Sequence, residues 1–88
     1  MPENKKKNIS PKLMTGTYRH YKGKLYEVLG VARHSETLEE LVVYRALYRS
    51  EFGLGSLWVR PKKMFMENVE IDGKMFPRFQ IIKRGRPS

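Results

Sequence analysis

Short runs of alternating apolar and polar residues, separated by glycine-containing breaks, constrain the fold of this chain more than any other feature. The two longest runs, Lys24–His34 and Leu41–Arg49, follow the period of two that is typical of β-strands. Shorter strands are predicted at Thr17–Tyr21, Leu57–Arg60 and Phe76–Ile82. Since no amphipathic segment is long enough for a substantial helix, we expect a mostly β domain. The pattern predicts a small SH3-like barrel of roughly five to six short strands, with an OB-like barrel as the alternative.

The breaks between these runs carry recognisable turn residues. Lys22-Gly23 separates the first two predicted strands, and Asp72-Gly73 is the strongest hairpin signal in the chain. Gly30 lies within the longest run, where a residue without a side chain would relieve a bend or bulge. Pro61 lacks the N–H that a strand ladder needs and ends the strand before it, and Lys62–Asn68 is predicted to form a helical turn.

Alternation along Lys24–His34 assigns its side chains to two faces. One face contains Tyr26, Val28, Gly30 and Ala32, and the other contains Leu25, Leu29 and Val31 together with Glu27 and Arg33. Both faces are partly apolar, which suits a strand that is covered on more than one side.

Length and composition restrict the class of protein. The 88 residues suffice for one small domain, and no internal repeat is evident. Without cysteine the chain has neither a disulfide framework nor a thiolate metal site, and such chains are usual in a reducing compartment. No apolar stretch follows the N-terminal lysines as in a signal peptide, and no apolar run approaches the ~18–20 residues that cross a bilayer. We therefore expect a cytoplasmic protein without membrane association.

Most of the positive charge lies near the two ends of the chain. The formal net charge is +9, but residues 16–80 hold 11 Lys/Arg against 8 Asp/Glu and contribute only +3. Residues 1–15 and 81–88 contribute +3 each, with few apolar side chains to offset the entropy of ordering. We predict a disordered basic arm over 1–15, a folded barrel domain over 16–82 and a basic tail over 83–88. Basic segments of this kind favour polyanionic partners.

One break, rich in hydroxyl and acidic side chains, contains the best candidates for a small-ligand or hydrolytic site: His34, Ser35, Glu36 and Thr37. Such a site needs these side chains to converge, whereas neighbours along an extended chain point to opposite faces. The simpler interpretation is that Ser35 and Thr37 bond local backbone groups in a turn. We expect this break at a rim of the barrel with Arg60 close by. Because two histidines and scattered carboxylates make a weak metal site, no metal, cofactor or enzymatic activity is predicted.

Aromatic residues are interleaved with cations in several short stretches, as in small barrels that stack bases or peptides beside basic side chains. The candidates for a binding surface are His20, Tyr44, Trp58 and Arg60. Trp58 and Arg60 fall on one face of their short strand. If the alternating Leu57 and Val59 point inward, this pair faces solvent and forms a binding hot spot. The alternative is that Trp58 and the tyrosines are core residues.

The C-terminal residues Lys83-Arg84-Gly85-Arg86-Pro87 resemble the AT-hook core of minor-groove DNA binders. The resemblance implies that Arg84 and Arg86 insert into a narrow, A·T-rich minor groove on either side of Gly85. This sequence departs from the AT-hook pattern at two places, because Lys83 stands where the pattern has a proline and no basic residue follows Pro87. The alternatives are non-specific attraction of a polyanion by Lys83, Arg84 and Arg86, or a tail that only raises solubility.

Three sequence blocks occur in order along the chain: YRHYKGKLYEVLGVARHSETLE over residues 18–39, VVYRALY over 42–48 and WVRPKKMF over 58–65. Through these blocks, residues 16–80 resemble a bacterial domain-of-unknown-function family of small proteins and accessory domains. The resemblance implies a compact β-rich fold and brings no established activity. The connection over residues 49–56 looks longer than is usual in that family.

Three functional hypotheses follow. The first is a small non-enzymatic binding module that holds DNA or RNA through its basic ends and an aromatic and arginine surface. The second is an accessory domain that binds another protein or a peptide, with incidental basic ends. The third is a ligand-binding or hydrolytic site around His34–Thr37.

Overall fold

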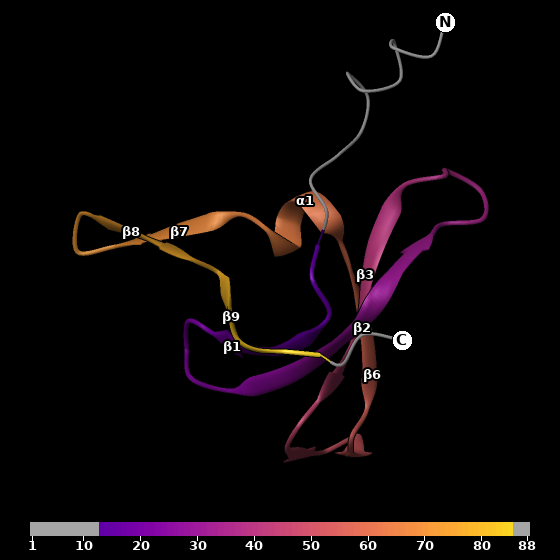
Figure 1. Ribbon diagram of the computed structural model, residues 1–88, viewed down its shortest axis with the longest axis horizontal. Helices are drawn as coiled ribbons and strands as arrows, with labels where there is room; N and C mark the ends of the chain where they lie inside the picture. The colour runs from indigo at the N-terminus through magenta and orange to yellow at the C-terminus, as the bar shows by residue number, and fades with distance from the viewer. Residues whose placement is uncertain (1–12, 86–88) are drawn as a thin grey trace, which may run out of the picture.

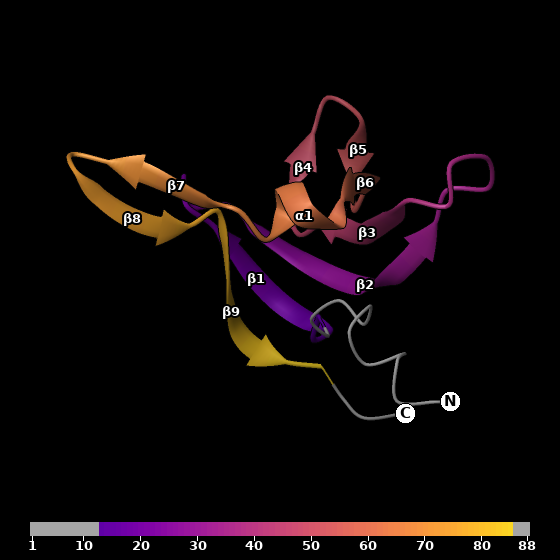
Figure 2. The ribbon, with the colours of Figure 1, turned by 90° about the horizontal axis from the view of Figure 1, so that it is seen from above.

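The ordered elements of the protein are nearly all strands (Figures 1 and 2). The computed structural model describes residues 13–85. In chain order the elements are β1 (Gly16–His20), β2 (Leu25–Arg33), β3 (Glu40–Ala46), β4 (Arg49–Ser50), β5 (Gly53–Leu54), β6 (Leu57–Pro61), α1 (Lys62–Phe65), β7 (Asn68–Ile71), β8 (Lys74–Pro77) and β9 (Phe79–Arg84). The mostly β class is confirmed, and a helical turn follows Pro61 as expected.

The main sheet is antiparallel and open. Its strand order is β6-β3-β2-β1-β9, so β6 and β9 are its edges, while β4–β5 and β7–β8 pair as separate hairpins. Within the described part of the chain no pairing joins the two edges, so the expected SH3-like or OB-like closure is not formed. The Asp72-Gly73 turn keeps β7 paired with β8, and this hairpin extends away from the sheet (Figure 2). Only β9 remains from this region to join the main sheet.

The β7–β8 turn has the backbone conformation that its sequence predicts. Asp72 has φ 52° and Gly73 has φ 80°, and positive φ at both central residues is the requirement of a type I′ hairpin. The predicted last strand is divided, because Phe76 belongs to β8 and β9 begins at Phe79. Between them, the Arg78 N–H donates to the Glu67 carbonyl at 2.9 Å and bends the chain back to the sheet.

One face of the main sheet collects its aromatic side chains. Paired residues on neighbouring antiparallel strands point to the same side, and the register pairs Tyr18 with Tyr26, Val28 with Tyr44, and Tyr44 with Trp58. We call this side the aromatic face; it carries Tyr18, His20, Tyr26, Val28, Val31, Val42, Tyr44, Trp58, Arg60 and Phe79. The other side is the opposite face.

The core lies between the aromatic face and α1. It comprises Tyr18, Val28, Val42, Tyr44, Phe65 and Phe79. Phe65 projects from α1, is only 1% exposed, and stacks on Phe79 with ring centroids 4.1 Å apart. Tyr18 and Tyr44 are therefore core residues.

A bulge in β2 changes the predicted alternation. Val28 pairs with Tyr44 and Gly30 pairs with Val43, so Leu29 is an extra residue beside the glycine where a bulge was expected. One extra residue reverses the faces beyond it. Val31 pairs with the buried Val42 and joins the aromatic face, which corrects its expected grouping with Leu25 and Leu29.

The side chains of strand β6 point to the sides opposite to those expected from the sequence, where Leu57 and Val59 pointed inward and Trp58 and Arg60 faced solvent. Trp58 pairs with Tyr44 and Arg60 pairs with Val42, so both lie on the aromatic face. Leu57 and Val59 instead lie on the opposite face, 62% and 59% exposed. Trp58 is 38% exposed and lies on β6, an edge strand of the sheet.

The folded part extends past both predicted boundaries. Leu13 packs against the core, the Tyr18 hydroxyl donates to the Met14 carbonyl at 2.6 Å, and Gly85 N–H donates to the Thr15 carbonyl at 3.0 Å. Lys83 and Arg84 pair with β1, so they belong to a strand and not to a tail. Residues 1–12 of the predicted arm and Arg86 lie outside the described residues. No helix in residues 13–85 is long and apolar enough to cross a membrane.

Candidate functional site

The sequence-predicted site residues separate into two groups. His20, Tyr44, Trp58 and Arg60 come together on the aromatic face, from three strands of the main sheet. The segment 34–37 forms the turn between β2 and β3. Arg60 contacts Tyr44 and Phe79 on the aromatic face, and in the described part of the chain it makes no hydrogen bond or ion pair with this turn, against which we expected it.

The β2–β3 turn uses its polar side chains to hold its own backbone. His34 Nδ1 accepts the N–H groups of Glu36 at 3.1 Å and Thr37 at 3.3 Å. Thr37 Oγ1 in turn accepts the Glu39 N–H at 3.2 Å. The imidazole lone pair and the Thr37 hydroxyl oxygen are thus engaged locally, while Ser35 is exposed. This arrangement agrees with the turn interpretation and supplies no nucleophile paired with a base.

The solvent-accessible part of the aromatic face is the stronger candidate. We call it the aromatic–cation surface and define it by His20, Tyr26, Tyr48, Trp58 and Arg60. The Tyr26 ring lies at its centre, edge-on to Tyr48 at 5.5 Å between centroids, and its hydroxyl is hydrogen-bonded to that of Tyr48 at 2.7 Å. The His20 ring is 6.5 Å from Tyr26. These contacts link His20, Tyr26 and Tyr48, which are far apart in sequence.

Arg60 is the principal charge on this surface. Its Nε donates to the Tyr44 hydroxyl at 3.3 Å, and its guanidinium carbon lies 5.6 Å from the Phe79 ring centroid. Within residues 13–85 it forms no ion pair, whereas Arg45 pairs with Glu27 at 3.7 Å. The guanidinium is therefore positioned by rings and a hydroxyl, with its charge uncompensated by a described carboxylate.

Trp58 supplies a ring more than a hydrogen-bond donor. Its Nε1–H already donates to Ser56 Oγ at 3.0 Å, and the ring is held edge-on by Phe52 at 5.5 Å. The indole is consequently oriented by the β4–β5 hairpin, and part of its apolar area stays accessible.

His20 is electrically neutral near pH 7 in this environment. Burial lowers its pKa from the usual 6.5, and the positive charges of Arg60, Arg78 and Lys22 lower the pKa further. His20 Nδ1 accepts the Lys22 N–H at 3.1 Å, so the proton of the neutral ring is on Nε2. The imidazole of His20 thus offers its Nε2–H as a hydrogen-bond donor near the positive charges of Arg60, Arg78 and Lys22.

Tyr26, at the centre of the surface, also keeps its hydroxyl proton. Burial, then the hydrogen bond to Tyr48, raises the pKa of Tyr26 far above its usual value. Lys24 Nζ lies 4.5 Å from the Tyr48 ring and adds another cation at the margin. The surface therefore presents donors, cations and ring faces. No three metal-ligating side chains gather anywhere in residues 13–85.

Sequence reasoning did not single out Tyr26, Tyr48 or Phe79. The period of two placed Tyr26 on the face of Val28, which was a usable signal for its side of the strand. Phe79 reaches the site only because β9 pairs with β1 across more than fifty intervening residues, and no local pattern encodes that pairing.

The fold and this surface define a small open-sheet β domain with a cationic aromatic face. The chain belongs to the family described as protein of unknown function (DUF1653), which matches residues 16–81. It is similar to the crystal structure of a DUF1653 protein from Bordetella bronchiseptica, with 38% sequence identity and a TM-score of 0.73, covering 86% of this chain and 95% of that one. No curated protein matches the chain.

Proposed function

We propose that this protein is a non-enzymatic binding module that holds single-stranded nucleic acid on the aromatic–cation surface. The observation that carries the proposal is the placement of Arg60, without a described acidic partner, on the same face as the part-exposed Trp58. Proteins that bind single strands combine aromatic rings, on which bases stack, with cations that meet the phosphates. Both components lie within one surface here.

The electrostatics of the surroundings support the same class of ligand. His20 adds an Nε2–H donor, and Lys22 and Lys24 lie over the rings of Tyr21 and Tyr48 at 5.8 and 4.5 Å. Lys83 and Arg84 are exposed on the edge strand β9 and extend the positive charge along the molecule. An AT-hook mode is not part of the proposal, because Arg84 and Gly85 are paired with the chain around Gly16.

The test is binding of a fluorescent oligothymidylate of ~12 nucleotides, followed by anisotropy at about 50 mM salt, where phosphate contacts are strong. Trp58→Leu should weaken binding roughly tenfold, because one stacking ring is lost. Arg60→Gln should weaken binding and reduce the log–log salt slope by about 0.7, as expected for one phosphate contact to a single strand.

The matched control is Arg45→Gln. This substitution removes the same charge from the opposite face, where Arg45 pairs with Glu27 and both side chains are about half exposed. Equal effects of Arg60→Gln and Arg45→Gln would show that only net charge matters and would exclude the surface. Absence of any binding at this salt concentration would overturn the proposal.

A second candidate, protein binding, is favoured by a different observation. Leu57 and Val59 are exposed on the opposite face of the edge strand β6, which has one unpaired side within the described sheet. Edge strands of this kind accept an additional strand from a partner. If Val59→Thr abolished binding of a protein partner and left oligothymidylate binding unchanged, protein binding would be assigned to this edge.

A further inference from the structure

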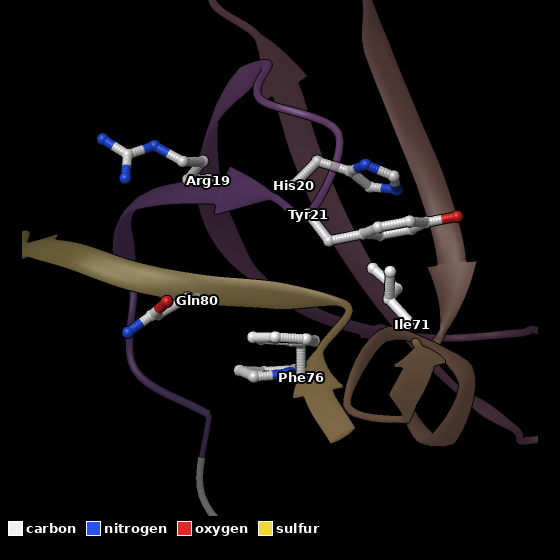
Figure 3. Close-up of a pocket in the computed structure, with 7 residues that line it drawn as sticks. Arg19, His20, Tyr21, Ile71, Phe76 and Gln80 are labelled. Atoms are coloured by element: carbon white, nitrogen blue, oxygen red, sulfur yellow. The ribbon is translucent and has the colours of Figure 1, made fainter. Parts of the chain in front are cut away.

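A pocket of about 320 Å³ lies where the end of β1 meets the β7–β8 hairpin (Figure 3). Its lining residues are Arg19, His20, Tyr21, Ile71, Phe76, Pro77 and Gln80. The pocket exists because the hairpin leaves the main sheet and returns at β9, so apolar side chains of the hairpin face the β1–β2 turn and not the core. No residue of it was singled out from the sequence except His20.

The pocket has an apolar end and a polar end. Tyr21, Ile71 and Phe76 lie toward one end, each about two-fifths exposed. Arg19 and Gln80 are register partners on β1 and β9, and their side chains extend toward the other end (Figure 3). In the described part of the chain, neither the guanidinium nor the carboxamide is hydrogen-bonded or ion-paired to another group.

The pocket is continuous with the aromatic–cation surface. His20 lines both, and its ring lies 4.5 Å from the Tyr21 ring, tilted by 33°. His20 therefore joins the pocket to that surface at the end of β1, while Arg19 and Gln80 lie on the opposite face of the sheet. The volume of about 320 Å³ is at the lower limit of small-molecule sites and is large enough for one nucleobase.

We propose that this pocket takes one unstacked nucleobase of the bound strand. The faces of the base contact the Tyr21 and Phe76 rings, the Gln80 carboxamide hydrogen-bonds the edge of the base, and Arg19 meets the adjoining phosphate. Recognition of single strands commonly uses bases splayed out onto aromatic side chains and read along their edges. The inference rests on the proposed function and adds to it a site that distinguishes bases.

The first experiment titrates the ¹⁵N-labelled full-length protein with each of four 5′-nucleoside monophosphates. We expect saturable shifts of the Gln80 side-chain amide and of the Arg19 and Tyr21 backbone amides, with one base preferred. Inorganic phosphate alone should leave these resonances in place. Equal shifts with phosphate would show an ion site and overturn the proposal, as would preferential saturation by N-acetylphenylalanine, which would assign the pocket to a peptide carboxylate.

The second experiment uses variants that test the pocket independently of the aromatic–cation surface. Phe76→Leu keeps apolar volume but removes a stacking ring, and should weaken mononucleotide binding roughly tenfold. Gln80→Ala should reduce the preference among bases. Arg45→Gln is the control on the same face of the sheet as Gln80 but outside the pocket. Thermal unfolding of each variant checks that the fold is kept.

The outcomes are distinct. Oligothymidylate binding that depends on Trp58 and Arg60, together with unchanged nucleotide binding in Phe76→Leu, overturns the pocket and leaves the proposed function in place. Failure of the oligothymidylate to bind overturns the proposed function, and with it the base site, even where a free mononucleotide still binds. Loss of nucleotide preference in Gln80→Ala with retained strand affinity supports both.

Discussion

At the scale of single residues, the structure assigns different roles to side chains of the same type. His34 uses its lone pair to hold a turn, whereas His20 lies among aromatic rings and its Nδ1 accepts the Lys22 N–H. Arg45 is neutralised by Glu27, whereas Arg60 is held by a hydroxyl and a ring. Composition alone does not distinguish the members of either pair.

The environment of His20 predicts a pH dependence of stability. Its pKa in the folded state is below the usual 6.5, so the unfolded chain binds the proton more readily. The contribution of His20 to folding stability is therefore fully present above pH 6.5 and is lost as the pH decreases from 6.5 toward the folded-state pKa. Urea unfolding at a series of pH values should show this decrease, and His20→Gln should flatten it. An NMR titration that placed the His20 pKa above 6.5 would contradict the prediction.

At the scale of elements, the edge pairing of β1 with β9 depends on Gly16. This residue has φ 137°, which L side chains rarely adopt, and a Cβ there would overlap the Lys83 carbonyl and the Gly85 N–H. Gly23, in the β1–β2 turn, has φ 108°, but nothing lies within 4 Å of the position of its Cβ. An alanine at Gly23 would suffer conformational strain alone, whereas an alanine at Gly16 would suffer both strain and steric overlap with backbone atoms of β9 and Gly85.

Gly16→Ala should therefore destabilise the protein more than Gly23→Ala. Strain alone costs about 1–3 kcal/mol at a position of this kind, and the overlap with β9 backbone atoms adds to it in Gly16→Ala. Chemical denaturation gives the two unfolding free energies, and amide exchange should show lost protection in β9 for Gly16→Ala only. Equal losses of unfolding free energy in the two variants would mean that β9 shifts away from the Cβ added at Gly16 without a cost in stability.

At the scale of the whole molecule, stability depends on one helical turn that covers an open sheet. α1 is four residues long and has no stability of its own, yet it places Phe65 against Phe79, Tyr18 and Tyr44. These rings come from four elements and make up most of a small core. The core is shared between β1, β2, β3, β9 and α1, so its loss affects the whole domain.

Phe65→Ala should remove a large part of the folding stability. Truncation of a buried phenylalanine costs about 3–5 kcal/mol, against the roughly 5–15 kcal/mol that stabilises a typical domain. The control is Phe52→Ala on the β4–β5 turn, where the ring is 64% exposed and edge-on to Trp58. Its cost should be at most about 1.5 kcal/mol. Thermal unfolding followed by circular dichroism measures both, and similar melting temperatures for the two variants would refute the assignment of the core.

The amino-acid sequence by itself determined the features that local physics controls. The period of two predicted the strands, Asp72-Gly73 predicted a hairpin that has positive φ at both residues, and Pro61 predicted the end of β6. The polar turn after β2 and the bulge beside Gly30 also follow from nearby residues. Each of these depends on backbone conformations and hydrogen bonds within a few positions of the chain.

Only the tertiary structure decided how these elements combine. Whether the sheet closes depends on which strand pairs with which, and self-pairing of β7 with β8 leaves it open. The side to which Trp58 and Arg60 point depends on the register of β6 with β3, because a shift of one residue exchanges the two faces. The lowered pKa of His20 likewise depends on burial, and then on the charges of Arg60 and Arg78, which only folding brings near it. Strand pairing and burial depend on residues far apart in the sequence, so no local pattern encodes them. The candidate site depends on both and was therefore only partly predictable.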